Sequence, residues 1–526
     1  MTRTLGCLFI ISLTFLSADI WAGQPVGNHK GKIVSRSVPK SFFAVEEVLH
    51  KFHNRIDDCP QNCPDSVKRW QPRKLPVPEK IISRVRFWRQ VYSEWNYTQI
   101  AFHDRDDLNM VYTVIDVPWP GQRRNGLSRS ETIKKTKKQL VRVLEDLEVL
   151  QPTSTAGLTG LHRQVYLALM HIQRGDKYRR QDLLRAQNGL RDTFAMAIEN
   201  AGRYQAMMVD ILKANDLPED LFAVVFVESL FQNRAKSYAG AAGLWQFMPR
   251  TGKEYMHVNR LVDERYDPVL ATESAAKYLS SAFKRLGTWP LAITSYNVGV
   301  AGMYRGVKTV GTHDFGVIVE NYFGNNFGFA ARNYYSEVLA AWEVFQHRKR
   351  YFPDVKMLPS WKYDVVRLSF PILFSHAVHF SGIDKDILKN LNPALTKAAL
   401  EDKVVLPRGF SFRVPLQQSD RFLSGLEDIN LRTRRSLAKR VEVKHRANGK
   451  QTLLEIAKKF RVSPQNLSRL MGIMTTDIPP KGTWIPVPKY AKNHSLFPRA
   501  RHLPLPVFDD LVFASEIEKL RAGPRS

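Results

Sequence analysis

Hydrophobic residues recur at intervals of three and four along much of the chain, which predicts a mainly α-helical protein. In the segment 217–249, the apolar stripe Leu221, Val224 and Val225 leads to the acid Glu228 on the same helix face. A carboxyl group on a buried face resists ionisation, and a general acid needs that property near neutral pH. The helix pattern alone favours a plainer interpretation, a salt-bridged glutamate at the helix edge. The assignment of Glu228 therefore depends on the neighbouring sequence.

The hydrophobic pattern changes along the chain and divides it into regions. Residues 23–179 form a mixed, mostly helical N-terminal region, in which strand-like runs around a polar turn predict a hairpin over 99–117. A Ser-x-x-Glu capping box at Ser128 predicts a helix that ends near Gln151. Helical spacing, without a strand pattern, continues over 158–212.

A mainly helical domain is predicted over 180–350, around the segment that carries Glu228. Its later part has a second apolar helix face with the same spacing, formed by Leu279, Ala282, Phe283 and Leu286. A domain of this length has room for a hydrophobic core and a long cleft.

The sequence after this domain alternates between strand and helix patterns. Residues 440–488 predict a β-α-α-β unit, and residues 363–415 predict a weaker copy of it. Equivalent leucines keep a constant spacing between the two copies, which supports an internal repeat. The polar, arginine-rich stretch 417–439 is interpreted as a linker, and residues 489–526 as a tail.

The first residues have the pattern of a signal peptide. A short basic start precedes the apolar run 5–16, which is too short to span a bilayer comfortably. Small residues follow, with Ala22 the favoured cleavage position and Ala18 the alternative, so the predicted signal peptide covers 1–22. No later run reaches transmembrane length. We therefore expect an exported protein of the periplasm or cell envelope.

Two cysteines, Cys59 and Cys63, remain after this cleavage. An oxidising compartment favours a local disulfide between them over two free thiols. A metal site would need further ligands, and none is grouped nearby; the histidines also lack metal-ligand spacing. The glycines of the GAAG block at 240–243 form neither a dinucleotide fingerprint nor a phosphate-binding loop. No metal and no cofactor are therefore predicted.

The composition adds a strong positive charge to this picture. The 526 residues include 78 Lys and Arg against 50 Asp and Glu, for a formal net charge of +28. Such a balance suits nucleic acid, anionic lipid or an acidic cell-wall polymer, and it is also compatible with a merely basic protein. Nucleic-acid binding is disfavoured because no recognition motif is present and the predicted export conflicts with it.

Four sequence blocks follow one another in the helical domain. They are VES at 227–229, GLWQFM at 243–248, ITSYNVG at 293–299 and FGFAARNYY at 327–335. In this order, over roughly 188–345, the chain resembles the family 1 lytic transglycosylases, whose soluble-lytic-transglycosylase domain has a lysozyme-like fold. The β-α-α-β units resemble LysM modules. The resemblance implies a lysozyme-like helical catalytic domain followed by small LysM modules.

The resemblance also implies roles for individual residues. Glu228 matches the family's single catalytic acid and base. The residues implied to contact the glycan are Ser229, Ser237, Gln246, Met248, Tyr296, Asn297 and Tyr334. The chain departs from the family pattern at Trp245, at Ser295 and at residues 330–331, where two alanines replace the usual Glu-Thr before the late tyrosine.

A single acid without a partner nucleophile implies an unusual reaction, because ordinary glycosidases use two carboxylates. By resemblance, Glu228 protonates the oxygen between MurNAc and GlcNAc in peptidoglycan and then accepts the proton of the MurNAc C6 hydroxyl. That hydroxyl closes on C1 and leaves a 1,6-anhydro end. The LysM-like unit 440–488 is expected to bind GlcNAc-containing glycan, whereas the copy at 363–415 lacks a usual motif. A lysozyme-like hydrolase and a non-catalytic wall-binding scaffold are the alternatives.

Overall fold

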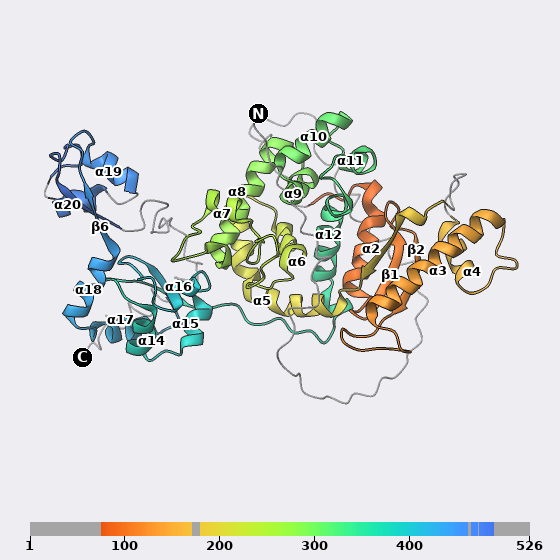
Figure 1. Cartoon of the computed structure of the whole chain (residues 1–526), viewed down its shortest axis with the longest axis horizontal. Helices are drawn as coiled ribbons and strands as arrows, with labels where there is room; N and C mark the ends of the chain where they lie inside the picture. The colour runs from red at the N-terminus through yellow and green to blue at the C-terminus, as the bar shows by residue number, and fades with distance from the viewer. Residues whose placement is uncertain (1–74, 171–178, 461–463, 472, 489–526) are drawn as a thin grey trace, which may run out of the picture.

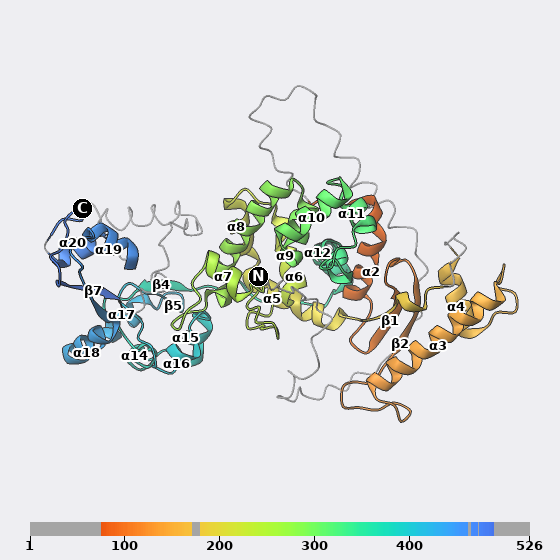
Figure 2. The same ribbon diagram turned by 45° about the horizontal axis from the view of Figure 1, so that its top comes forward.

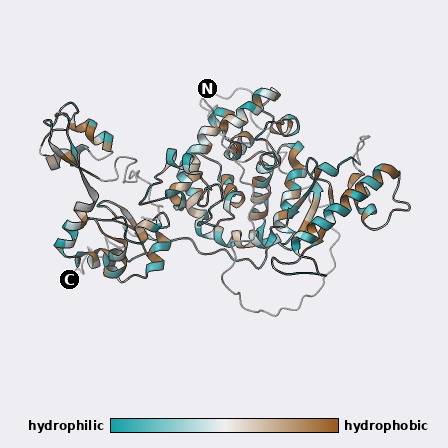
Figure 3. Ribbon diagram, viewed as in Figure 1, coloured by the Kyte–Doolittle hydropathy of each residue, from teal (hydrophilic) through white to brown (hydrophobic). Residues whose placement is uncertain are grey.

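The computed structural model describes residues 75–170, 179–460, 464–471 and 473–488, and it confirms a mainly helical protein. Figure 1 follows the chain from β1, β2 and α3 through a central group of helices to α19 and α20. The helices carry both hydrophobic and hydrophilic residues, as amphipathic helices do (Figure 3). Within the described residues, no helix is long and apolar enough to cross a membrane.

The N-terminal part contains the predicted hairpin. Strands β1 (Gln99–Asp104) and β2 (Val111–Asp116) pair antiparallel. A third strand, β3 (Leu184–Asn188), pairs antiparallel with the other edge of β1, so the sheet order is β2-β1-β3. The sequence-based expectation of uninterrupted helical spacing over 158–212 is wrong at this strand. The short 3-10 turn η5 (Gln181–Leu183) leads into it.

Two helices cover this sheet. Helix α3 (Arg129–Leu150) begins at the predicted capping box, in which the Ser128 side chain accepts from the Glu131 backbone and the Glu131 carboxylate accepts from the Ser128 backbone. Helix α4 (Gly160–Leu169) follows it. Their apolar faces form one buried cluster with the sheet, which includes Leu140, Leu144, Ile100 and Phe102. The capping box and the helix it predicts are thus confirmed.

The central helices share one large core. It contains buried residues from Leu75 to Phe352, so α2 (Ile82–Ser93) and the turn η4 (Glu79–Ile81) before it pack with the helices that follow β3. Those elements are α5 (Arg191–Ala214), η6 (Glu219–Ala223), α6 (Val224–Ser229), α7 (Pro249–Tyr255), η7 (Glu264–Tyr266), α8 (Pro268–Leu286), α9 (Trp289–Val298), α10 (Val300–Val310), α11 (Phe315–Asn321), α12 (Phe329–Gln346) and α13 (Arg348–Tyr351). Figure 2 shows α9, α10, α11 and α12 grouped beside α2.

The C-terminal part contains two units, each with a pair of antiparallel strands; the second has the predicted β-α-α-β order, whereas the first has three helices between its strands. In the first, β4 (Asp364–Arg367) pairs antiparallel with β5 (Ser411–Val414), and α14 (Phe374–Ser381), α15 (Lys385–Leu391) and α16 (Lys397–Leu400) lie between them in the chain. In the second, β6 (Glu442–Arg446) pairs antiparallel with β7 (Trp484–Pro488), with α19 (Leu453–Phe460) and α20 (Pro464–Met471) between them.

The stretch 417–439 is not an extended linker. It forms α17 (Ser419–Glu427) and most of α18 (Leu431–Val441). Phe422, Leu426 and Ile429 are buried in the core of the first C-terminal unit. These three residues have helical spacing, and their burial outweighs the polar and charged residues between them.

The first C-terminal unit is attached to the central helices. The Arg413 guanidinium forms a two-bond ion pair with Asp267, at 2.5 and 2.9 Å, and both side chains are largely buried. The Asp263 amide donates to the Ala394 carbonyl at 2.8 Å, and Leu261 lies in the buried cluster of the C-terminal unit. The loop before α8 is therefore part of both cores.

Several sequence-based predictions fall on residues that the structure does not describe. They are the signal peptide 1–22, the cysteines Cys59 and Cys63, and the tail 489–526. The domain boundaries at 180, 350, 363, 415, 440 and 488 stay predictions.

Candidate active site

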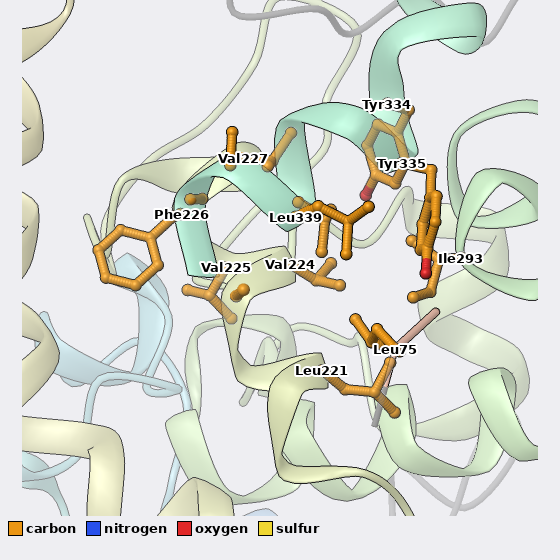
Figure 4. Close-up of a cluster of buried hydrophobic side chains, with 14 of the residues drawn as sticks. Leu75, Leu221, Val224, Val225, Phe226, Val227, Ile293, Tyr334, Tyr335 and Leu339 are labelled. Carbon is orange, nitrogen blue, oxygen red and sulfur yellow. The ribbon is translucent and has the colours of Figure 1, made fainter. Parts of the chain in front are cut away.

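Helix α6 places Glu228 at the boundary between the core and an open pocket. Leu221, Val224 and Val225 are fully buried, as their stripe predicts, and they pack beside Tyr334 and other core residues of α12 (Figure 4). Glu228 itself is partly accessible and lines the pocket. The helix ends immediately afterwards because the next two residues, 230 and 231, adopt the left-handed conformation with φ of 50° and 55°. Such strained backbone is frequent beside functional groups.

The pocket collects side chains from four separate parts of the chain. It is lined by Glu228, Gln246, Phe247, Met248, Thr251, Tyr278, Tyr296, Asn297 and Gly299. Five of the eight residues that the sequence analysis selected are thus brought together: the acid, Gln246, Met248, Tyr296 and Asn297. Of the described residues that line the pocket, the acid is the only one with a carboxyl group.

Sequence reasoning missed four of the lining residues. Phe247 and Gly299 stand inside blocks that the sequence analysis quoted, so their position was a usable signal. Tyr278 is the residue before the apolar stripe of α8, and its hydroxyl donates to the Ser295 carbonyl at 2.9 Å. Thr251, near the start of α7, has no sequence signal that we can identify.

The carboxyl group of Glu228 is held by a hydrogen bond. The Tyr334 hydroxyl, delivered by α12, donates to Glu228 Oε1. Burial raises the pKa of Glu228 to about 8, and the Tyr334 hydrogen bond offsets part of that rise because it favours the charged form. Near neutral pH the acid therefore holds its proton, as a general acid requires. The alanines at 330–331 do not prevent Tyr334 from reaching the acid.

Ser229 and Ser237 are placed differently from the other selected residues. The Ser229 hydroxyl is buried and donates to the Leu244 carbonyl at 2.8 Å. The Ser237 hydroxyl accepts from the Ala241 amide at 3.0 Å. Neither residue is among those that line the pocket. Both side chains hold the backbone of the glycine-containing loop, and their contact with a sugar stays a prediction.

The loop that carries Gln246 and Met248 has a conformation that requires glycine. Gly243 has φ of 80°, and a Cβ there would lie 1.7 Å from the Arg265 carbonyl oxygen. The Arg265 guanidinium in turn donates to the carbonyls of Gly240 and Phe247, at 2.7 and 2.9 Å. One buried arginine thereby ties both ends of the loop to η7.

Aromatic rings form one wall of the pocket. The ring of Tyr296 lies 5.9 Å from that of Phe247 and 5.2 Å from that of Tyr278, both nearly edge-to-face. The Tyr296 hydroxyl donates to the Trp245 carbonyl at 2.8 Å. Trp245, which departs from the family pattern, is fully buried and donates from Nε1 to Thr272 at 2.9 Å. Trp245 thus supports this wall from behind.

A second buried carboxyl group lies near the acid but outside the pocket lining. Glu337 follows Tyr334 by one turn of α12 and is 4% exposed. Burial, and then the nearby Glu228, raise the pKa of Glu337 to about 8. Among the residues that the structure describes, no cluster of His, Cys, Asp or Glu could hold a metal ion. The chemistry that Glu228 can supply in this pocket is proton transfer.

Comparison with known proteins relates this pocket to transglycosylases. Residues 208–317 match the family model described as Transglycosylase SLT domain. The matched segment includes Glu228, Gln246 and Tyr296, and it ends before Tyr334.

Three known proteins illustrate the similarity. The membrane-bound lytic murein transglycosylase D of Escherichia coli K12 is 27% identical over 236 residues, which are 44% of this chain and 51% of that protein. A putative tributyltin chloride resistance protein of Alteromonas sp. strain M-1 is 28% identical over 117 residues, or 22% of this chain and 56% of that protein. The structure of an inactive mutant of the lytic transglycosylase Slt from Pseudomonas aeruginosa covers 41% of this chain and 31% of its own, at 19% identity and a TM-score of 0.24.

The chain spans about half the length of the curated relatives it matches. The similarity to the Transglycosylase SLT domain lies on the same residues, 208–317, that build the pocket around Glu228.

Proposed function

We propose that this chain is a peptidoglycan lytic transglycosylase, a lyase that cleaves the β-1,4 bond between MurNAc and GlcNAc and leaves a 1,6-anhydro-MurNAc end. One observation carries the proposal: the only carboxyl group among the described lining residues, Glu228, is protonated near neutral pH and bonded to Tyr334, in a segment similar to the SLT domain. A lysozyme-like fold for residues 180–350 belongs to this proposal.

The reaction needs one group that first gives and then accepts a proton. Neutral Glu228 protonates the bridging oxygen, and the C1–O bond to the leaving GlcNAc breaks with development of positive charge at C1. The carboxylate that results then takes the proton of the MurNAc C6 hydroxyl, whose oxygen forms the new bond to C1. The acid ends in its starting state. Atoms and charge balance without water.

Tyr334 has a defined part in this cycle. Its hydroxyl donates to the carboxyl oxygen, and a hydrogen bond to the charged form lowers the energy of the carboxylate intermediate. Burial and the neighbouring Glu228 raise the pKa of Tyr334 well above its ordinary value, so the tyrosine remains a donor throughout.

The remaining selected residues are proposed to hold the glycan. Gln246, Met248 and Asn297 line the pocket beside the acid, and the Tyr296 ring in the same lining can pack against an apolar sugar surface. Ser229 and Ser237 are proposed to contact sugar only through the loop that they hold.

The C-terminal unit 440–488 is proposed to be a LysM module that binds GlcNAc-containing glycan, and 363–415 a degenerate copy. Support comes from the β-α-α-β order of 440–488, from the antiparallel strand pair that 363–415 also has, and from the constant leucine spacing. A second tethered glycan site raises the local substrate concentration at the pocket. Export to the periplasm or cell envelope, with the peptidoglycan strand as partner, fits the net charge of +28.

Product analysis tests the proposal. Purified peptidoglycan is digested with wild type and with Glu228→Gln, and the products are identified by mass spectrometry. Glu337→Gln is the matched control because it replaces a buried carboxyl that does not line the pocket. We expect anhydro-MurNAc ends with wild type and the control, and none with Glu228→Gln. Reducing MurNAc ends would show that the chain is a hydrolase and not a lyase. Binding without any cleavage would indicate a non-catalytic scaffold.

A further inference from the structure

A second, more polar pocket adjoins the first. It is lined by Val298, Gly302, Arg305, Tyr322, Asn325, Asn326 and Phe327. Asn297 and Gly299 line the first pocket, and Val298 between them lines the second, so the end of α9 forms a wall common to both. The other walls come from α10 and from the segment between α11 and α12, which lie side by side in Figures 1 and 2.

The only charged side chain among the described residues that line this pocket is Arg305. Arg305 is exposed on α10 and has no acidic partner among the residues that the structure describes. Its Nη2 lies 3.9 Å from the position that a Cβ on Gly302 would take. The guanidinium therefore folds back along its own helix, over a residue that lines the pocket.

The floor of this pocket is aromatic and fixed. The buried rings of Tyr322 and Phe327 lie 5.2 Å apart. Arg332 donates to the Tyr322 carbonyl at 3.0 Å, and Tyr322 also packs on α10 where Gly306 leaves room for its ring. The exposed amides of Asn325 and Asn326 supply donors and acceptors at the rim.

A guanidinium without an acidic partner among the described residues, beside amide donors, is suited to a carboxylate, which it can bind through two parallel hydrogen bonds. A peptidoglycan strand offers carboxylates on the stem peptide attached to each MurNAc, at a short distance from the bond that the first pocket would cleave. We infer that the Arg305 pocket binds a stem-peptide carboxylate of the strand held at Glu228. This inference rests on the proposed function, and it assigns a preference for strands that still carry peptides.

A second carboxylate has the same chemistry. When an amidase removes the stem peptide, the lactyl group of MurNAc keeps a free carboxylate close to the sugar ring. Strands with peptides and strands stripped of them therefore distinguish the two sources, because the peptide carboxylate exists only in the first.

The experiment measures binding where no turnover occurs. Soluble glycan strands, with stem peptides or stripped by an amidase, are titrated by calorimetry into Glu228→Gln protein, alone and combined with Arg305→Gln. Lys308→Gln is the matched control because Lys308 is also exposed on α10 but does not line the pocket. We expect Arg305→Gln to weaken binding of peptide-bearing strands about tenfold, the scale of one lost charge-assisted hydrogen bond at an open site. Binding of stripped strands and of the control should not change.

Two outcomes would overturn the inference. Equal binding of peptide-bearing strands with and without Arg305→Gln removes the site. A loss for stripped strands as large as that for peptide-bearing strands, or larger, shows that the site accepts the lactyl carboxylate, which the amidase frees, and removes the preference for peptides. The proposed lyase activity fails separately, if wild type produces no anhydro-MurNAc ends. Cleavage by wild type together with unchanged binding in Arg305→Gln would leave the lyase and refute only the peptide site.

Discussion

The substitution Tyr334→Phe deletes only the hydroxyl group of Tyr334 and so removes its hydrogen bond to Glu228. In the wild type this bond favours the carboxylate and lowers the pKa of Glu228 against the larger effect of burial, which leaves a pKa of about 8. The variant keeps the ring and therefore the packing around the acid, but it takes away the donor. Burial then acts without an opposing contribution, so the pKa of Glu228 should rise further.

The size of the shift follows from the energy of the bond. A hydrogen bond to a charged group contributes about 1.5–3 kcal/mol, and one pKa unit corresponds to about 1.4 kcal/mol. We therefore expect the pKa of Glu228 to rise by about 1–2 units in Tyr334→Phe. The carboxylate intermediate loses the same stabilisation, so the turnover rate should fall by about 10- to 100-fold.

The pH dependence of kcat/KM on soluble glycan strands measures this shift. The acid must be protonated to react, so activity in the wild type should fall as pH rises through about 8. In Tyr334→Phe the same fall should occur at a pH about 1–2 units higher, on a lower plateau. Tyr335→Phe is the matched control, because the Tyr335 hydroxyl donates to the Pro76 carbonyl at 2.6 Å and not to the acid. It should leave the alkaline limb in place.

An alkaline limb that stays near its wild-type position in Tyr334→Phe would refute this reasoning. It would mean that the tyrosine does not stabilise the carboxylate in solution. A limb that moves to the same extent in Tyr335→Phe would show instead that loosening of α12, common to both variants, changes the environment of the acid.

Three other changes test other parts of the structure, each by urea denaturation. The pKa of Glu228 is raised from 4.5 to about 8, so the wild type loses stability as pH rises through this range. The free energy of unfolding of Glu228→Gln should equal that of the wild type at pH 4 and exceed it at pH 9, by up to about 5 kcal/mol. Gly243→Ala should destabilise by about 3 kcal/mol because it adds a clash to a positive φ, whereas Gly287→Ala, with φ of 79° and open space, should lose only about 1 kcal/mol. Asp267→Asn keeps an oxygen that can cap α8 but leaves Arg413 without its buried partner, at a loss of about 3 kcal/mol.

Local patterns in the sequence predicted the elements whose stabilising contacts are local. The hairpin has strand-like runs on either side of a polar turn, and α3 has a capping box within four residues. Strand β3 was missed because its sequence, LRAQN, lacks a run of apolar residues, and its pairing with β1 depends on backbone bonds across more than eighty positions. Helix α17 was missed because arginines and polar residues obscured the spacing of Phe422, Leu426 and Ile429, although that spacing was present.

The candidate site likewise contains residues that local sequence patterns predicted and residues whose place depends on contacts between distant segments. The helix stripe predicted only that Glu228 lies next to a buried face, and the neighbouring sequence blocks selected it as the candidate acid. Tyr278 was missed because its role arises from the crossing of α8 and α9, which no periodicity in α8 alone reveals. Ser229 was selected by motif, but its hydrogen bond to the Leu244 carbonyl is a property of the folded loop. Sequence blocks locate the chemistry, whereas the assignment of each neighbour to pocket or scaffold needs the packing.

The structural unit that positions the acid extends beyond residues 208–317. Tyr334 reaches Glu228 from α12, which packs against α6 and α9 and also against α2. From α2, the Arg84 guanidinium donates to Asn333 at 2.9 Å, next to the tyrosine. Burial lowers the pKa of Arg84 to about 10, which still leaves it charged at neutral pH and able to hold Asn333. The N-terminal region thus helps to hold the helix that carries Tyr334, although none of its described residues lines the pocket.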